Sequence, residues 1–109
     1  LETVIDAVPM RMFWKDTECR YLGCNRRFAE DVGVPPGEGI IGQTDDAMPW
    51  ADISDRVRAD DLLVLRGEAQ SITAERRITP HGAEPIWIET HKVPIRDDAG
   101  AIIGVLGTY

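Results

Sequence analysis

The feature that most constrains the fold is a two-residue period in the last third of the chain. Residues of alternating faces follow one another through "SITAERRIT" and "IWIETHKVPI", at residues 71–79 and 86–95, and the apolar run "AIIGVLGTY" follows at residues 101–109. A period of two is typical of β-strands with one buried face. The intervening segments, "PHGAEP" and "RDDAG", are rich in turn residues. The pattern therefore predicts three consecutive antiparallel strands in a meander.

The first third predicts a β-hairpin followed by a short helix. The apolar runs "MRMFWKD" and "RYLGC" flank the turn "DTEC". Asn25 is a good helix N-cap, because its side chain can accept from the backbone N–H of Arg27 or Phe28. Gly33 can end that helix in the left-handed conformation.

The other segments are predicted to be helical. Residues 1–8 have helical spacing and are ended by Pro9. "QTDDAMPW" predicts a short helix capped by Thr44 or Asp45. A longer helix is expected from about residue 52 or 54 to residue 66, with a glycine as its stop.

This order of elements predicts an α+β fold, with a five-stranded antiparallel sheet and short helices packed on one face. The 109 residues fit one domain. We expect residues 1–8 to be the end of a flanking helix and residues 10–109 to be the core. The chain looks like a module cut from a longer protein.

The net charge and the hydrophobicity of the chain restrict the kinds of partner that it can bind. A net charge of −7 argues against nucleic acid or an anionic membrane surface, which both require a basic footprint. The sequence has no apolar run long enough to span a bilayer. We expect a cytoplasmic domain that contacts neither nucleic acid nor membrane, in a parent protein that can itself be membrane-anchored.

Three segments, in this order and spacing, resemble a PAS domain, the small sensory module of bacterial signalling proteins. They are "FWKDTECRYLGCNRRFAEDVGV", "IIGQTDDAMPW" and "IWIETHKVPIRDDAGAIIGVLGTY". The first resembles the family's opening hairpin and helix, the second its Ile-Gly-x-x-Asp loop, and the third its closing hairpin. The resemblance covers essentially the whole chain.

The resemblance implies a non-catalytic sensory domain that binds a small ligand between the sheet and the helices. In such proteins the final strand, here residues 101–109, leads to a helix that carries the signal to a C-terminal output domain of the same chain. Typical outputs are a histidine kinase of a two-component system or a diguanylate cyclase. The alternative is a ligandless module for dimerisation and relay.

Flavin and haem, two cofactors of the family, are not expected. Light-sensing relatives form a flavin adduct on a cysteine within Gly-x-Asn-Cys, where this chain has Thr44 and Asp45 in place of the last two residues. Cys24 lies on an earlier strand, so we expect it to be a packing residue. Haem-binding relatives place a histidine on the long helix, whereas His81 falls in a turn and His91 in a late strand.

Metal binding and catalysis are not expected either. The cysteines and histidines form Cys-x4-Cys and His-x9-His, which are not the usual zinc spacings. Neither a serine nucleophile elbow nor a phosphate-binding glycine loop is present in the sequence. The acidic positions lack a calcium-loop pattern and predict a solvated face. They are Asp45, Asp46, Asp52, Asp55, Asp60 and Asp61.

The expected cavity has apolar and polar candidate residues. The apolar candidates are Phe13, Phe28, Met48, Trp50, Leu62, Val64 and Trp87, and the polar ones that could orient a ligand are Asn25, Arg56, Glu75 and Thr90. A charged residue facing the cavity would mark a site, because burying an unpaired charge is costly. The apolar stripe of the first helix could form a homodimer contact across a twofold axis. Its members are Leu1, Val4, Ile5 and Val8.

Overall fold

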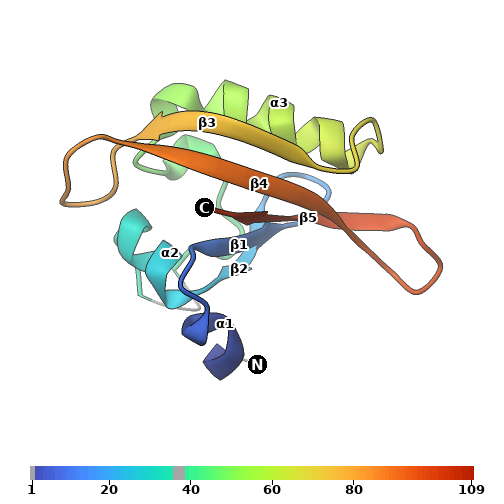
Figure 1. Cartoon of the computed structure of the whole chain (residues 1–109), viewed down its shortest axis with the longest axis horizontal. Coiled ribbons are helices and arrows are strands. Elements are labelled where there is room, and N and C mark those ends of the chain that lie inside the picture. Colours follow the sequence, from blue (N-terminus) through green and yellow to red (C-terminus); the bar gives the residue numbers. More distant parts are fainter. Residues whose placement is uncertain (1, 36–38) are drawn as a thin grey trace.

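The computed structural model describes residues 2–35 and 39–109 and is built around a five-stranded antiparallel sheet, as the sequence predicts (Figure 1). The order of the strands across the sheet is β2-β1-β5-β4-β3. The last strand therefore lies between the opening hairpin and the rest of the meander. The strands are β1 (Met12–Lys15), β2 (Tyr21–Cys24), β3 (Ile72–Ile78), β4 (Ile86–Arg96) and β5 (Ile102–Thr108).

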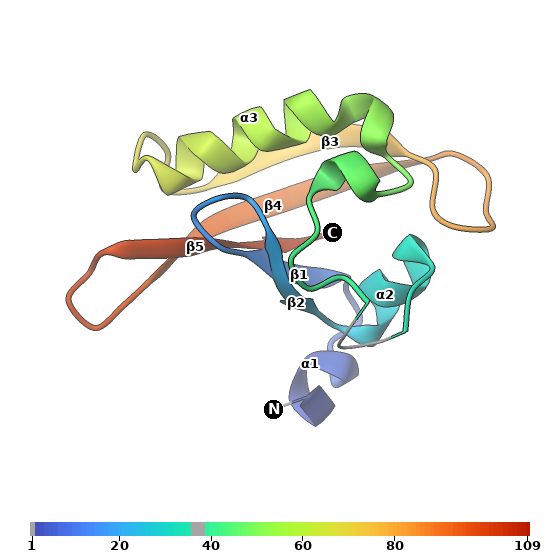
Figure 2. The ribbon, with the colours of Figure 1, turned by 180° about the vertical axis from the view of Figure 1, so that it is seen from behind.

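Figures 1 and 2 show α3 lying along one face of the sheet, over β3 and β4, with α2 beside β1 and β2. Two short 3₁₀ turns connect these helices, while α1 lies beyond β1 and β2 at the edge of the fold. The helical elements are α1 (Glu2–Ala7), α2 (Arg26–Val32), η1 (Asp45–Ala47), η2 (Ala51–Ile53) and α3 (Ser54–Leu65). The sheet and these elements form the predicted α+β fold.

Asn25 joins three elements through one buried side chain. Its Oδ1 accepts from the backbone N–H of Phe28 at 3.1 Å, which confirms the predicted N-cap of α2, and from that of Met12 at 3.0 Å. Its Nδ2 donates to the backbone carbonyls of Ile5 and Met10 at 3.2 and 2.7 Å. Asn25 is only 1% exposed, and these contacts fix α1, β1 and α2 relative to one another.

The close approach of β5 to β1 depends on Gly107. A Cβ on this residue would lie 2.1 Å from the ring carbon Cζ of Phe13, so any larger side chain would displace the ring. Phe13 in turn packs against Phe28 with ring centroids 4.8 Å apart and against Tyr21 at 5.8 Å. The glycine thus sets the position of an aromatic core that reaches across the inner face of the sheet.

Cys24 packs at the end of β2, 7% exposed, as the sequence indicates. Burial raises the pKa of its thiol to about 11, with a smaller contribution from Asp6. Both cysteines are buried free thiols. A thiol with a raised pKa holds little thiolate at neutral pH, which suits a packing role.

Candidate ligand pocket

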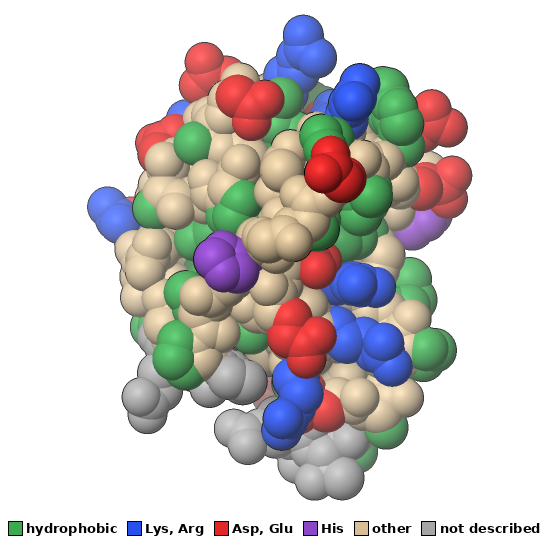
Figure 3. All heavy atoms as spheres, turned by 90° about the vertical axis from the view of Figure 1, so that its left-hand side faces the viewer, with side chains coloured by type: hydrophobic (Ala, Val, Ile, Leu, Met, Phe, Trp, Pro, Cys, Tyr) green, Lys and Arg blue, Asp and Glu red, His purple; other side chains and the backbone are tan. Residues whose placement is uncertain are grey.

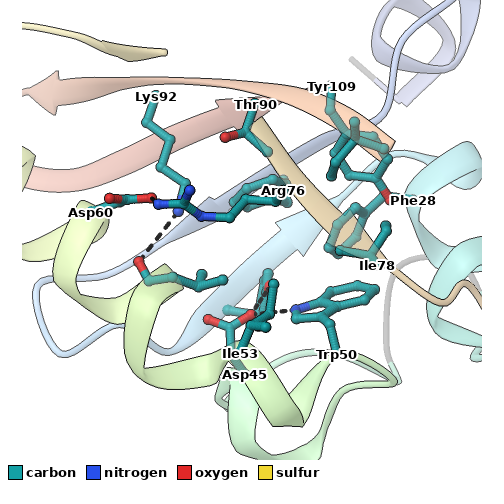
Figure 4. A pocket seen from close by; sticks show the side chains of 14 residues that line it. Phe28, Asp45, Trp50, Ile53, Asp60, Arg76, Ile78, Thr90, Lys92 and Tyr109 are labelled. Carbon is teal, nitrogen blue, oxygen red and sulfur yellow. Dashed lines mark hydrogen bonds and ion pairs between the residues drawn. The ribbon is translucent and has the colours of Figure 1, made fainter. Parts of the chain in front are cut away.

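A small cavity lies between the inner face of the sheet and the helical layer (Figure 4). The cavity has a volume of about 30 Å³. Its lining residues are Phe13, Tyr21, Phe28, Asp45, Trp50, Ile53, Val57, Asp60, Arg76, Ile78, Ile88, Thr90, Lys92 and Tyr109.

Aromatic rings form one side of the cavity. Phe28 lies at the centre of this group, with its ring centroid 5.5 Å from that of Trp50 and 6.0 Å from that of Tyr109. Both contacts are edge-on, an arrangement that aromatic pairs favour. Figure 4 shows the rings of Phe28, Trp50 and Tyr109 on the same side of the hollow. These rings offer flat apolar surface to a bound molecule.

A buried ionic cluster adjoins the cavity, and two of its members, Asp45 and Lys92, belong to the lining. The Nζ of Lys15 donates to Asp45 and to Asp61, each at 2.6 Å, and the Nζ of Lys92 donates to Asp61 at 2.6 Å. All four side chains are at most 3% exposed. Tyr21 Oη and Trp50 Nε1 also donate to Asp45, at 2.6 and 2.8 Å. Each buried carboxylate therefore accepts from at least two donors.

The two lysines experience different environments. Burial disfavours the charged form of Lys15, but the carboxylates of Asp61 and Asp45 outweigh it and raise the pKa of this ammonium. Lys92 has one carboxylate at contact distance, and burial lowers its pKa despite Asp61. Burial of Asp45 is outweighed by Lys15, so the pKa of this carboxyl is lowered. Lys15 is thus held as a cation and Asp45 as an anion.

A second ion pair borders the cavity. Nη2 of Arg76, on β3, donates to Oδ2 of Asp60, on α3, at 2.6 Å, and Nη1 donates to the backbone carbonyl of Glu75 at 2.9 Å. Nε of Arg76 is buried and has no hydrogen-bond partner within residues 2–35 and 39–109. In Figure 4 the Arg76 side chain crosses the hollow beside Thr90. Its free N–H is therefore a donor available to a molecule in the cavity.

Four candidates from the sequence line this cavity: Phe13, Phe28, Trp50 and Thr90. Three others lie in the core without being part of its lining, namely Asn25, Met48 and Val64, and Leu62 is half-buried on α3. Both polar atoms of the Asn25 side chain form hydrogen bonds with backbone groups, so neither is free to bind a ligand and the residue has a structural role.

The structure corrects the expectation for Arg56, Glu75 and Trp87. Arg56 is exposed on α3, where Val57 and Asp60 face the cavity instead. Glu75 and Trp87 occupy outward positions of β3 and β4, since neighbouring residues of a strand face opposite sides. Trp87 is 69% exposed. The charged strand residues that do face the cavity are Arg76 and Lys92, which lie one position after Glu75 and an odd number of positions after Trp87.

The predicted solvated acidic face is also only partly right. Asp46, Asp52 and Asp55 are exposed, whereas Asp45 and Asp61 are 2% and 0% exposed because they pair with buried lysines. Acidic and basic side chains are interspersed on the face shown in Figure 3. Within the described ranges, no group of three or more His, Cys, Asp and Glu could hold a metal ion.

The dimer-contact candidates have mixed exposure. Val4 is 66% exposed, and Ile5 and Val8 are partly buried, while Leu1 lies outside the described residues. Asp6 Oδ1 accepts from the backbone N–H of Arg26, so α1 is attached to the start of α2. None of the helices in the described part of the chain is both long and apolar enough to cross a membrane.

A family model for the PAS fold matches residues 5–109. Because this match covers nearly the whole chain, the protein belongs to the PAS fold family. Its members are generally non-catalytic sensory modules, which agrees with the resemblance drawn from the sequence.

Among curated relatives, the chain is 29% identical over 105 residues to the methanogenesis regulatory histidine kinase FilI of Methanothrix harundinacea (strain 6Ac). The alignment covers 96% of this chain and 12% of that kinase. This similarity supports a sensory signalling role for the domain.

Solved PAS structures have the same fold. VqmA bound to DPO superposes with a TM-score of 0.88 at 23% identity, covering 97% of this chain and 53% of that one. The Vibrio cholera VqmA–ligand–DNA complex gives the same score, over 47% of that chain. The PAS domain of BvgS from Bordetella pertussis gives 0.75 at 22% identity, covering 97% of this chain and 79% of that one.

Proposed function

We propose that this domain senses a small molecule in the cavity between sheet and helices and relays its binding to a C-terminal output domain. The observation that carries the proposal is the buried, unpartnered Nε of Arg76 beside an aromatic wall. Pockets that bind small molecules combine apolar walls with a few polar groups that orient the ligand. VqmA, which has the same fold, is bound to DPO in one of its structures.

The relay would begin at Tyr109, which lines the cavity and follows the last residue of β5. Its Oη donates to Oδ2 of Asp31 on α2 at 2.5 Å, and Nε of Arg11 donates to the same oxygen at 3.1 Å. A ligand that displaces the Tyr109 ring would disturb this bond at the end of the sheet. Binding would then shift the population of two arrangements of the chain that follows.

The output domain is proposed to be a histidine kinase or a diguanylate cyclase in the same cytoplasmic chain. The similarity to FilI favours the kinase. Contact of this domain with nucleic acid is not part of the proposal, because its net charge is −7. A thermal-shift screen of small metabolites tests ligand sensing, since a ligand that binds only the folded state raises the melting temperature.

The decisive comparison in that screen uses two variants. Ile88→Phe adds a ring at the cavity wall and should abolish the shift, whereas Ile103→Phe changes an exposed residue on β5 and should keep it. Equal shifts in both variants would place binding elsewhere. If no metabolite shifts the wild-type protein, the sensing proposal fails.

The second candidate function is dimerisation and relay without a ligand. It is favoured by the exposure of Val4 on α1, an apolar residue that a partner chain could cover. Light scattering of a chain extended at both ends should report a dimer that Val4→Glu weakens. A monomer at high concentration would contradict this candidate.

A further inference from the structure

The charges around the cavity balance. Three cationic side chains, Lys15, Lys92 and Arg76, pair with three carboxylates at 2.6 Å in each contact. The carboxylates belong to Asp45, Asp60 and Asp61. Every one of these groups has an opposite charge at contact distance. A charged ligand would therefore enter a site in which no counter-charge is free, and burying an unpaired ion is strongly unfavourable.

The charges around the cavity are paired, but one buried hydrogen-bond donor is not. Asp45 already accepts from Lys15, Tyr21 and Trp50, so its oxygens are occupied. Thr90 Oγ1 donates to the backbone carbonyl of Ala74 at 3.0 Å, so its proton is used. Nε of Arg76 is the buried side-chain donor without a partner in the described residues. An unsatisfied buried donor is costly, and a ligand oxygen or nitrogen that accepts from it removes that cost.

The walls define the remaining properties of the ligand. Five aromatic residues line the hollow. They are Phe13, Tyr21, Phe28, Trp50 and Tyr109. Flat rings stack or pack edge-on against such walls.

Resting on the proposed function, we propose that the ligand is a small uncharged ring molecule with a hydrogen-bond acceptor placed against Nε of Arg76. The balanced charges exclude a net charge on the ligand, the free N–H requires an acceptor, and the aromatic walls select a flat apolar body. Specificity would come mainly from that one bond, because a site built to pair a polar group rejects analogues that lack it.

Four probes of nearly equal shape separate these requirements: benzamide, benzoate, benzamidinium and isopropylbenzene. They are respectively uncharged with an acceptor, anionic, cationic, and apolar without an acceptor. Binding is measured by NMR titration of the whole domain. We expect benzamide to bind about tenfold or more tightly than each of the other three. Tighter binding of benzoate or benzamidinium would overturn the uncharged assignment, and equal binding of isopropylbenzene would overturn the acceptor.

The matched variants are Arg76→Lys and Arg77→Lys. The first keeps a cation for Asp60 but removes Nε, and the second makes the same change at the neighbouring exposed position of β3. We expect Arg76→Lys to reduce benzamide affinity by about tenfold and Arg77→Lys to leave it unchanged. Equal affinity in both variants would overturn the inference, and so would failure of all four probes to bind.

These results are distinguishable from failure of the proposed function. A metabolite that shifts the wild-type protein but not Ile88→Phe supports sensing in the cavity, whatever its charge. If that metabolite is an ion, or if it binds Arg76→Lys as well as wild type, the ligand class is wrong while the sensory function stands.

Discussion

Two charged groups lie beside the same cavity, and they differ in how fully their polar atoms are used. In the cluster of Lys15, Asp45, Asp61 and Lys92, each carboxylate accepts from two or more buried donors. In the Arg76–Asp60 pair, one buried donor stays free. A saturated cluster fixes the position of sheet and helices, whereas an unsaturated pair can recognise a ligand. The contrast predicts that changes in the cluster affect stability and that changes at Arg76 affect binding.

The largest effect is expected for Asp61→Asn, which removes the carboxylate shared by both buried lysines. Breaking a buried ion pair on one side leaves an uncompensated charge and should lower the free energy of unfolding by about 3–5 kcal/mol. Urea unfolding measures the loss. Asp55→Asn, at a side chain that is 99% exposed, is the matched control and should change stability by less than about 0.5 kcal/mol.

If Asp61→Asn does not fold, the double variant Asp61→Asn/Lys92→Met tests the same point. It removes one charge of each sign and leaves Lys15 paired with Asp45 at 2.6 Å. It should therefore be more stable than Asp61→Asn alone. A double variant that is less stable than the single one would show that charge balance does not stabilise the cluster.

Asn25→Ala should lower the free energy of unfolding by about 2 kcal/mol, more than a simple helix cap, because several backbone groups lose their buried partner. Asn25→Asp keeps the acceptor for Met12 and Phe28 but loses the donor to Ile5 and Met10. Because its second carboxylate oxygen would be buried against those two carbonyl oxygens, this variant should be at least as unstable as the alanine variant in urea unfolding. If Asn25→Ala lost ligand binding but kept its stability, the structural role of Asn25 would be contradicted.

Acid should weaken the cluster through Asp45. Its pKa is lowered on folding, chiefly because Lys15 outweighs the effect of burial, so its ionised form stabilises the native state. That contribution is complete above the ordinary value of 3.8 and is lost as the pH falls through the lower pKa of the folded state. Urea midpoints measured across this range should fall less steeply in Asp45→Asn than in Asp52→Asn. Identical slopes would mean that Asp45 is not held as an anion.

The smallest effect concerns Cys24, which lies outside both charged groups. With a pKa of about 11, its thiol should react with iodoacetamide far more slowly in the folded protein than in urea. Cys24→Ala should lower stability by about 1 kcal/mol through lost packing. Rapid labelling of the native protein, followed by mass spectrometry, would contradict a packing role.

Most of the fold is readable from the sequence because it depends on local signals. The alternation within residues 71–95 and the apolar run of residues 101–109 predict the meander, and Asn25 and Gly33 predict both ends of α2. The same alternation places Arg76 and Thr90 on the inner face and Trp87 on the outer one. Glu75 and Trp87 occupy the outward positions of this alternation, so it already places them away from the cavity.

The buried cluster was not predicted because its pairs are distant in sequence. Lys15 lies 30 residues from Asp45 and 46 from Asp61, so no local spacing relates them. One signal was present: Lys15 follows Phe13 by two positions and Lys92 follows Thr90 by two, so each lysine occupies an inward strand position. A lysine in such a position indicates a buried carboxylate partner.

The central claim is that the Nε–H of Arg76 donates a hydrogen bond to the ligand. It can be tested directly by following the Nε–Hε signal of Arg76 in an NMR titration with benzamide. We predict that this signal shifts and that its proton exchanges more slowly with water, because the donor becomes paired. Arg77, on the outer face of β3, should show no change. Saturating benzamide that leaves the Arg76 signal unchanged while moving the Trp50 signal would contradict the claim.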